Sequence, residues 1–219
     1  MRQSQPTMGK LAVEISMSLD GFVAGPNPTL ERPLGEGGES LHEWALSLES
    51  WRRPHGLPGG ETNASTAVVE ETLAATGAVV MGRGMFSGGA GPWEDDPNAD
   101  GWWGDDPPFH VPVFVLTHHP RDTVSKDGGT TFAFVTEGIE AALEEARAAA
   151  GAKDVYVTGG AAAVQQYLAA GLVDELQINL APVLLGGGTR LFDGPTAELK
   201  LIRVVEAPAV THLKYRVLA

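Results

Sequence analysis

The sequence predicts an α/β fold built around a mixed β-sheet. Apolar runs of strand length alternate with amphipathic helical patterns along most of the 219 residues. Glycines and prolines separate many of these segments, and the last segments before the C-terminus have strand character without a helix between them. Repeated strand–helix alternation that ends in consecutive strands is typical of an α/β domain with a mixed sheet.

The N-terminal half begins with a strand. Apolar residues alternate over 11–19, which places Leu11, Val13, Ile15 and Met17 on one face. The other elements expected here are helices over 40–51 and 65–76, the second ended by Gly77, a strand over 78–82 that is buried on both faces, and loops over 24–40 and 52–63.

The C-terminal half repeats this pattern after a long acidic, Trp-rich loop over 87–110. Loops of this length inside a domain are usually functional or mobile. A helix is expected from a Thr136 cap to Gly151. The remaining expected elements are strands over 112–117, 130–135, 154–160, 176–185, 201–208 and 211–218, and a helix over 161–171. The chain shows no repeat or clear linker, so we expect a flexible tail over 1–8 and a single domain over 9–219.

Composition excludes several classes of protein. The absence of cysteine rules out disulfides, thiolate zinc sites and cysteine nucleophiles, and the six histidines have no metal-binding spacing. A net charge of −13 argues against a general nucleic-acid or anionic-membrane partner. No apolar run approaches the roughly 20 residues that span a bilayer, and the first ten residues lack the apolar core of a secretion signal. We therefore expect a cytoplasmic protein without a metal.

The clearest candidate binding feature is Gly159-Gly160, where a predicted strand runs into a helix. Glycines at such a junction let a ligand approach the backbone, and the helix offers its first unpaired N–H groups and its positive dipole end. A phosphate or pyrophosphate is the natural occupant. The alternative is that the two glycines only make a tight turn, since the motif is shorter than a dinucleotide fingerprint.

Two further strand ends carry cations in this acidic chain. Arg83 follows the predicted strand over 78–82, and a guanidinium fork suits phosphate oxygens. The strand over 112–117 ends in Thr117, His118, His119 and, two residues later, Arg121. Ligands of open α/β sheets bind at the carboxyl ends of strands. Any one of these side chains is readily explained as solvated surface, but three such strand ends together favour a dinucleotide.

Other features admit two interpretations. The glycines within 184–192 form either a mobile flap beside a site or a wide hairpin loop. The acidic run over 94–96 is either a cation site or a solvated loop, and the second is favoured. Trp44, Trp93 and Trp102 or Trp103 either stack on a planar ring or, as is more usual, pack.

The order of these segments resembles a known superfamily. MSLDGFVAG (17–25), VVMGRGMF (79–86), VFVLTHHPR (113–121), VYVTGGAAAVQQYL (155–168) and VDELQINLAPVLLGGGTRLF (173–192) occur in sequence. Together they resemble the dihydrofolate reductase-like superfamily, most closely the stand-alone relatives of the reductase domain in the bifunctional riboflavin-biosynthesis deaminase-reductase. The resemblance extends over nearly the whole chain from Gly9.

The resemblance implies a three-layer α/β/α fold with a mostly parallel mixed sheet that binds NADPH, and a homodimer. It places Gly82, Arg83 and Met85 near the cofactor phosphates and Thr117 and His118 near the adenosine 2′-phosphate. The pyrophosphate and nicotinamide side is assigned to Gly159, Gly160, Ala161, Ala162, Ala163 and Val164, and the strand and loop beside the nicotinamide to Ser16, Val23 and Ala24.

The substrate half of the resemblance is weaker. Dihydrofolate reductases carry a carboxylate on the first helix, where this chain offers Glu43, and the riboflavin reductases carry a glutamate where this chain has Thr158. No zinc-deaminase motif precedes the reductase segments. Asp20 or Glu43 is the candidate proton relay, although Asp-Gly at a strand end is more often turn chemistry.

The function that this predicts is NADPH-dependent reduction of a small pyrimidine- or pterin-type heterocycle, like that of 5-amino-6-(5-phosphoribosylamino)uracil reductase. One alternative is a true dihydrofolate or pterin reductase. Another is an NADP-binding module without turnover.

Overall fold

The chain forms one large sheet and a two-stranded ribbon. The computed structural model describes residues 8–53, 55–89, 91–194 and 196–218. The sheet contains β1 (Leu11–Ser18), β3 (Thr76–Gly82), β4 (Pro112–Leu116), β5 (Val124–Ser125), β6 (Thr131–Val135), β7 (Asp154–Gly159), β8 (Glu175–Ala181), β10 (Glu198–Ala207) and β11 (Val210–Leu218). The ribbon pairs β2 (Phe22–Ala24) with β9 (Thr189–Arg190).

The large sheet is mixed, as predicted, and mostly parallel. Its order is β10-β11-β8-β1-β7-β3-β4-β6-β5. The six strands from β8 to β6 in this order are parallel to one another. The β10–β11 hairpin and the short β5 are antiparallel additions at the two edges. The parallel strands therefore bring their carboxyl ends to one edge, where a ligand crevice is expected.

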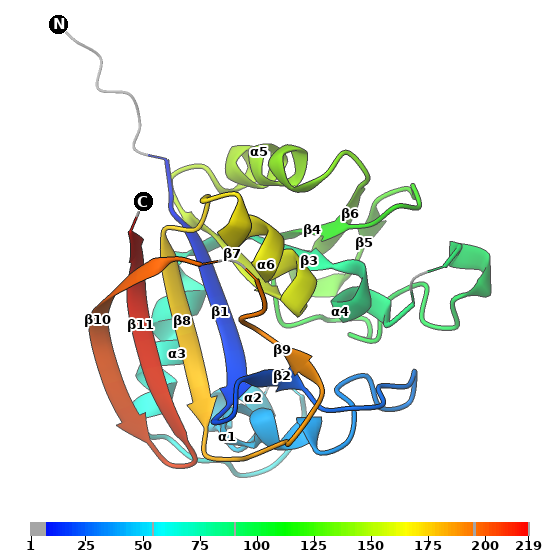
Figure 1. Ribbon diagram of the computed structural model, residues 1–219. Coiled ribbons are helices and arrows are strands. Elements are labelled where there is room, and N and C mark those ends of the chain that lie inside the picture. The colour runs from blue at the N-terminus through cyan, green and yellow to red at the C-terminus, as the bar shows by residue number, and fades with distance from the viewer. Residues whose placement is uncertain (1–7, 54, 90, 195, 219) are drawn as a thin grey trace, which may run out of the picture.

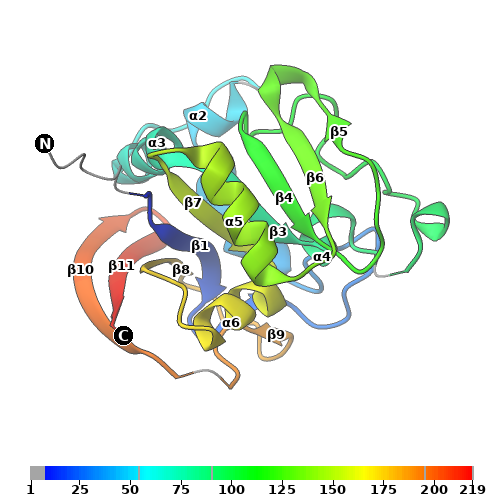
Figure 2. The same cartoon turned by 90° about the horizontal axis from the view of Figure 1, so that it is seen from above.

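Helices cover both faces of the sheet (Figures 1 and 2). The longer helices are α3 (Ala64–Ala75), α5 (Ile139–Ala150) and α6 (Ala161–Ala169). The shorter helices are α1 (Glu43–Leu46), α2 (Glu49–Arg52) and α4 (Arg83–Ser87), with single 3-10 turns at Gly38–Leu41, Trp93–Asp95 and Asp127–Gly129. Both α5 and α6 pack on one face, whereas α3 lies across the other beneath β10. The α/β/α arrangement of the prediction is confirmed.

The two faces of β1 differ in chemistry. Leu11 and Val13 are fully buried in the main core, and Ile15 and Met17 pack against it, as the alternation predicted. The opposite face of β1 is also covered, but it carries polar side chains. Two of these, Ser16 and Ser18, are buried. A strand near the middle of a three-layer fold is covered on both sides, so its polar positions must find hydrogen-bond partners inside.

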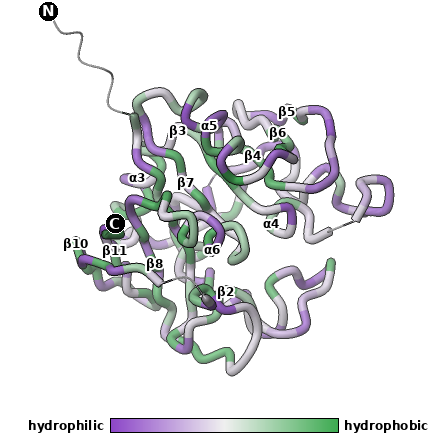
Figure 3. Tube along the Cα trace, turned by 45° about the horizontal axis from the view of Figure 1, so that its top comes forward, coloured by the Kyte–Doolittle hydropathy of each residue, from purple (hydrophilic) through white to green (hydrophobic). Residues whose placement is uncertain are grey.

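The long loop over 87–110 packs instead of extending freely. Its Trp93, Trp103 and Phe109 lie against the apolar face of β3, β4 and β6. Trp93 meets Phe86 and Phe134 edge to face, with ring centroids 6.0 and 4.9 Å apart. These aromatic side chains cover part of the sheet that a helix would otherwise cover. Hydrophobic residues gather along β4 and β7, and the outer part of this loop is hydrophilic (Figure 3).

Several predicted boundaries were wrong. The single helix expected over 40–51 is a 3-10 turn followed by α1 and α2, which a non-helical Leu48 separates. Gly77 lies inside β3, since Thr76 ends α3 with an extended backbone. The N-cap of α5 is Gly138, because the Thr136 hydroxyl donates to the neighbouring Glu137 carboxylate. The short strands β2, β5 and β9 were not predicted, because they are too brief to show periodicity.

The remaining predictions concern the N-terminal tail, the number of domains, membrane helices and metal sites. Residues 1–7 of the expected tail lie outside the described residues, and the single domain over 9–219 stays a prediction. Within the described residues, no helix is long and apolar enough to cross a bilayer. The same residues contain no cluster of three potential metal-binding side chains.

Candidate functional site

A cavity of about 1300 Å³ lies along the carboxyl ends of the parallel strands. Its walls come from β1, β3, β4 and β7, from the starts of α4 and α6, and from the loops over 23–34 and 87–103. The lining includes thirteen residues singled out from the sequence: Ser16, Val23, Ala24, Gly82, Arg83, Met85, Thr117, His118, Gly159, Gly160, Ala161, Ala162 and Ala163. Val164, the remaining predicted cofactor residue, is fully buried in the main core.

The start of α6 provides backbone donors at the middle of this cavity. The N–H groups of Ala163 and Val164 donate to the Gly160 carbonyl. Those of Ala161 and Ala162 have no hydrogen-bond partner among the described residues, and no side chain caps the helix. Unpaired N–H groups and the positive end of a nine-residue helix favour an anion.

Glycines keep this region open. The peptide bond between Gly159 and Gly160 is cis, and Gly159 has a φ of +143°. A Cβ on Gly159 would lie 2.8 Å from the Met85 sulfur, so no larger residue fits. A Cβ on Gly160 would meet nothing within 4 Å, which means that its Cα borders open space. A ligand can therefore approach the backbone here as closely as the sequence suggested.

The carboxyl end of β4 forms a second part of the cavity. Thr117 is buried, and its hydroxyl oxygen accepts from the His119 N–H at 3.1 Å. His118 is exposed at the cavity wall. Both were predicted near a 2′-phosphate, and both line the same cavity as the α6 N-terminus.

The guanidinium of Arg83 is bound within the protein. Its Nη2 donates to the Asp96 carboxylate at 2.5 Å and its Nε to the Ser87 hydroxyl at 2.9 Å. The Trp93 ring lies 3.2 Å from the guanidinium carbon. Although desolvation acts against it, hydrogen bonds from Ser87 and Arg83 hold the pKa of Asp96 below its usual value. A phosphate would therefore have to compete with Asp96 for this cation.

Arg121 is bound in a similar way. It pairs with Asp100 at 2.5 Å, donates to the Ala99 carbonyl, and lies 5.0 Å from the Trp93 ring. The acidic loop thus neutralises both arginines at the ends of β3 and β4. The sequence did not indicate these pairs, because the partners are separated by 13 and 21 residues.

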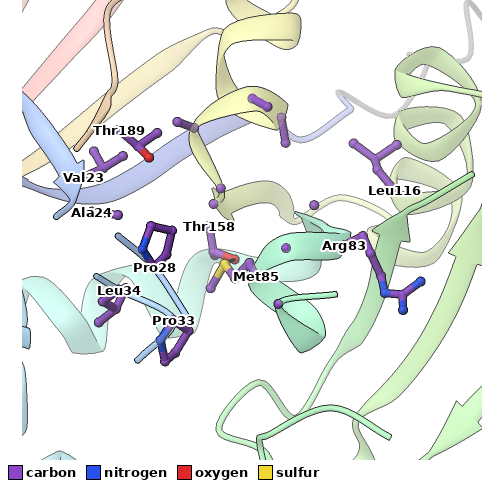
Figure 4. Close-up of a pocket in the computed structure, with 18 of the residues that line it drawn as sticks. Val23, Ala24, Pro28, Pro33, Leu34, Arg83, Met85, Leu116, Thr158 and Thr189 are labelled. Atoms are coloured by element: carbon purple, nitrogen blue, oxygen red, sulfur yellow. Dashed lines mark hydrogen bonds between the residues drawn. The ribbon is translucent and has the colours of Figure 1, made fainter. Parts of the chain in front are cut away.

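The far end of the cavity is apolar. It is formed by the loop over 28–34, by α1 and α2, and by Trp102 of the long loop, and it was missed in the sequence. Its lining consists mainly of Pro28, Leu30, Pro33, Leu34, Ala45, Leu46, Trp51 and Trp102. Figure 4 shows Pro28, Pro33 and Leu34 on one side of Thr158 and Met85, with Arg83 on the other. Composition identified 24–40 only as a loop. Hydrogen bonds within the segment, such as that from the Gly25 N–H to the Leu34 carbonyl, fold it back on itself, and a loop composition does not indicate this shape.

The two candidate proton relays lie outside this lining. Asp20 accepts from the Ser18 hydroxyl at 2.6 Å and from the Leu185 and Gly186 N–H groups. The Ser18 hydrogen bond is the largest influence that lowers the pKa of Asp20, to about 2, so this carboxylate holds no proton at neutral pH. Its role in the structure is to tie the end of β1 to the glycine-rich loop. Glu43 is exposed at the start of α1.

A buried polar network supports the cavity from behind. His212 contacts the Asn179 side-chain oxygen at 2.7 Å through Nδ1 and the Ser65 hydroxyl at 2.8 Å through Nε2. The Asn179 amide donates to Glu14, so Nδ1 of His212 is assigned as the donor. The Trp44 ring packs edge-on against His212, and its Nε1 donates to the Ser16 hydroxyl at 3.2 Å. Trp44 therefore packs its ring in the interior and uses its N–H to hold Ser16 at the cavity wall. A hydrogen-bond partner for the N–H is usual in buried tryptophans.

Comparison with known proteins finds a matching family and similar solved structures. Residues 9–213 match the RibD C-terminal domain. No curated protein matches the chain. A putative riboflavin biosynthesis protein from Shewanella sp. PV-4 has a similar structure, with a TM-score of 0.63 and 22% identity over 96% of this chain and 99% of that one.

Two further solved structures have the same fold. The riboflavin biosynthesis reductase Rib7 of Saccharomyces cerevisiae has a TM-score of 0.55 and 15% identity, over 99% of this chain and 93% of that one. Dihydrofolate reductase from Enterococcus faecalis, complexed with NADP(H), has a TM-score of 0.56 and 15% identity, over 96% and 97%. The predicted resemblance to the dihydrofolate reductase-like superfamily is confirmed.

Proposed function

The chain belongs to the RibD C-terminal domain family, and on that premise we propose that it is a reductase that uses NADPH to reduce a small pyrimidine- or pterin-type heterocycle. The nearest known activity is that of 5-amino-6-(5-phosphoribosylamino)uracil reductase. The observation that carries the cofactor proposal is the pair of unpartnered N–H groups at Ala161 and Ala162 in a large cavity at the carboxyl ends of the strands.

The residues present fit an extended dinucleotide. The N-terminus of α6 would hold the pyrophosphate, and the glycines at 159 and 160 leave room for it beside the backbone. Thr117 and His118 would face the adenosine 2′-phosphate, as the resemblance implies. Ser16 and Ala24 would border the nicotinamide. When bound, NADPH supplies the hydride that reduces a carbon–nitrogen double bond, and a proton completes the new N–H.

The residues of the chain would mainly bind, orient and exclude water. Trp44 and the network behind it hold the Ser16 hydroxyl at the cavity wall. The apolar far end removes water from the reacting atoms, and this strengthens the electrostatic interactions there. Glu31 is the only carboxylate among the lining residues described, and it is exposed. We infer that the proton comes from water at the cavity mouth, not from Asp20 or Glu43.

The first test is a titration with NADPH and with NADH, followed by tryptophan fluorescence and energy transfer to the nicotinamide. We expect saturable binding that is tighter for NADPH. Gly160→Ala adds a methyl group where the cavity is open, and we expect it to weaken binding of both nucleotides. Gly187→Ala, also into open space but outside the cavity lining, is the matched control. Absence of nucleotide binding by the wild-type chain would contradict the proposal.

We also propose a homodimer that forms through the β10–β11 hairpin. Leu199, Leu201 and Val204 are exposed on the edge strand β10. They stand opposite Val217, Tyr215 and Leu213 of β11, and cross-strand partners share one face of a sheet. An apolar face at an exposed edge is typical of an association surface.

Light scattering after gel filtration tests this proposal. We expect a dimer for the wild type and a monomer for Leu201→Asp. Leu73→Asp is the control, since Leu73 on α3 is equally exposed, at 55% against 52% for Leu201. A dimer that survives Leu201→Asp would exclude this surface. The cytoplasmic location stays a prediction from the sequence.

A further inference from the structure

The two ends of the cavity differ sharply in charge. The end near α6 offers backbone donors to an anion, as described above. The far end lies beyond Thr158 and Met85, where Figure 4 shows Pro28, Pro33 and Leu34. Trp51 and Trp102 also belong to the cavity lining. If the proposed function holds, the cofactor occupies the first end and the substrate the second. The chemistry of the far end then defines what the substrate can be.

The described residues place no cationic side chain at the far end. Among the described residues that line the cavity, Arg83 is the only lysine or arginine. It lies at the opposite side of the cavity from Pro28 and Leu34, and its charge is paired with Asp96. His42 does line the far end, but burial lowers the pKa of its imidazole, which is therefore neutral at pH 7.

The arginines in neighbouring segments do not line the cavity either. Arg52 donates twice to the Pro58 carbonyl, and Arg190 stacks on the Phe22 ring. Arg32 and Arg53 are exposed and are absent from the lining. The charged group of these segments that does line the cavity is Glu31, whose pKa is lowered by hydrogen bonds from its own backbone N–H and from Thr29. An ionised carboxylate there repels an anion.

Within the far-end lining, the described residues offer a phosphate monoester no cationic partner. It carries a charge between −1.5 and −2, roughly, at pH 7, and burying a charge without a partner is strongly unfavourable. The residue before the glycine pair also offers no charge to a phosphate. It is Thr158, and the nearest polar contact of its hydroxyl is the Met85 sulfur at 3.8 Å.

We propose that the substrate of this chain is an uncharged planar heterocycle that carries no phosphate group. The rings of Trp51 and Trp102 supply aromatic surface for such a ring. The hydroxyls of Ser16 and Thr158 and the imidazole of His42 supply neutral hydrogen-bonding groups. This inference rests on the proposed function, because it takes the α6 end as the cofactor end.

The test compares matched ligands in the presence of saturating NADP⁺. The probes are 5-amino-6-(ribosylamino)uracil, its 5′-phosphate, and pterin, with binding followed by tryptophan quenching. We expect the unphosphorylated uracil compound to bind at least as tightly as its phosphate ester, and pterin to bind as well. A tenfold or greater preference for the phosphate ester would overturn the inference, as would failure of both unphosphorylated rings to bind.

A second variant tests whether the far end is the relevant one. Leu46→Arg places a cation in the far wall, where Leu46 is partly exposed. We expect it to raise affinity for the phosphate ester by roughly 10- to 100-fold, as one charge-assisted hydrogen bond does. Leu73→Arg, on α3, is the control. No selective gain in Leu46→Arg would overturn the assignment of this end. Loss of NADP⁺ binding itself would instead count against the proposed function.

Discussion

The carboxylate of Asp96 and the guanidinium of Arg83 lie 2.5 Å apart in a pair that solvent scarcely reaches. The side chains are 2% and 8% exposed, respectively, and the Trp93 ring covers the guanidinium. This pair anchors the acidic loop to the carboxyl end of β3, and so fixes one wall of the cavity. The neighbouring pair of Arg121 with Asp100 has the same length, but its carboxylate is 75% exposed.

Asp96→Asn is expected to lower the free energy of unfolding by about 3 kcal/mol, because it leaves a buried guanidinium without its counter-charge. Asp100→Asn should change it by less than about 1 kcal/mol, since exposed pairs contribute little. Urea unfolding of the two variants measures both values. Equal losses of unfolding free energy in the two variants would show that the buried Arg83–Asp96 pair contributes no more than the exposed Arg121–Asp100 pair.

Gly88→Ala is expected to displace the Trp102 ring. Gly88 has a φ of +76°, and a Cβ there would lie 2.9 Å from that ring. Gly171→Ala at the end of α6 is the control, since its φ of +66° carries the same strain of about 1–2 kcal/mol without any neighbour within 4 Å. Both variants should lose stability, but only Gly88→Ala should raise KM for the substrate. An unchanged KM in Gly88→Ala would show that Trp102 does not contribute to substrate binding.

Ala161→Pro removes one of the unpaired N–H groups of α6 at a helix position that tolerates proline. The preceding Gly160 has an extended ψ of −178°, which suits a following proline. We expect NADPH binding to weaken by roughly 10- to 100-fold, the value of one hydrogen bond to a charged group. Ala64→Pro, at the first position of α3, should bind NADPH like the wild type. Equal affinities in a nucleotide titration would exclude this helix end as the anion site.

The buried His212 gives the fold a predictable response to acid. Burial, with help from Arg203, lowers the pKa of His212 from 6.5 to about 4. Between these values the unfolded chain binds a proton that the folded chain does not, so stability falls as pH drops from 6.5 to 4 and levels off below. His212→Gln should remove this part of the pH dependence, as urea unfolding at several pH values would show. If the free energy of unfolding depends on pH to the same degree in both proteins between pH 4 and 6.5, folding does not lower the pKa of His212.

The sequence by itself determined the arrangement of the fold and identified many of the residues that line the cavity. Alternation over 11–19 identified the buried apolar face of β1, because a strand places every second residue on one side. The glycine pair before α6 indicated where the cavity reaches the backbone, because only glycine permits that backbone and that approach. These properties depend on residues close together in the chain, which a sequence displays directly.

Only the tertiary structure decided the state of the charges and the apolar character of the far end of the cavity. Arg83 was an available cation in the sequence, but in the fold it is paired with Asp96 and covered by Trp93. Asp20 was a candidate acid, but backbone and hydroxyl donors hold it ionised. The apolar far end brings the loop over 28–34 and the helices α1 and α2 together with Trp102, which is distant in sequence. Pairing and burial depend on which distant segments meet, and neither spacing nor composition encodes those contacts in a readable way.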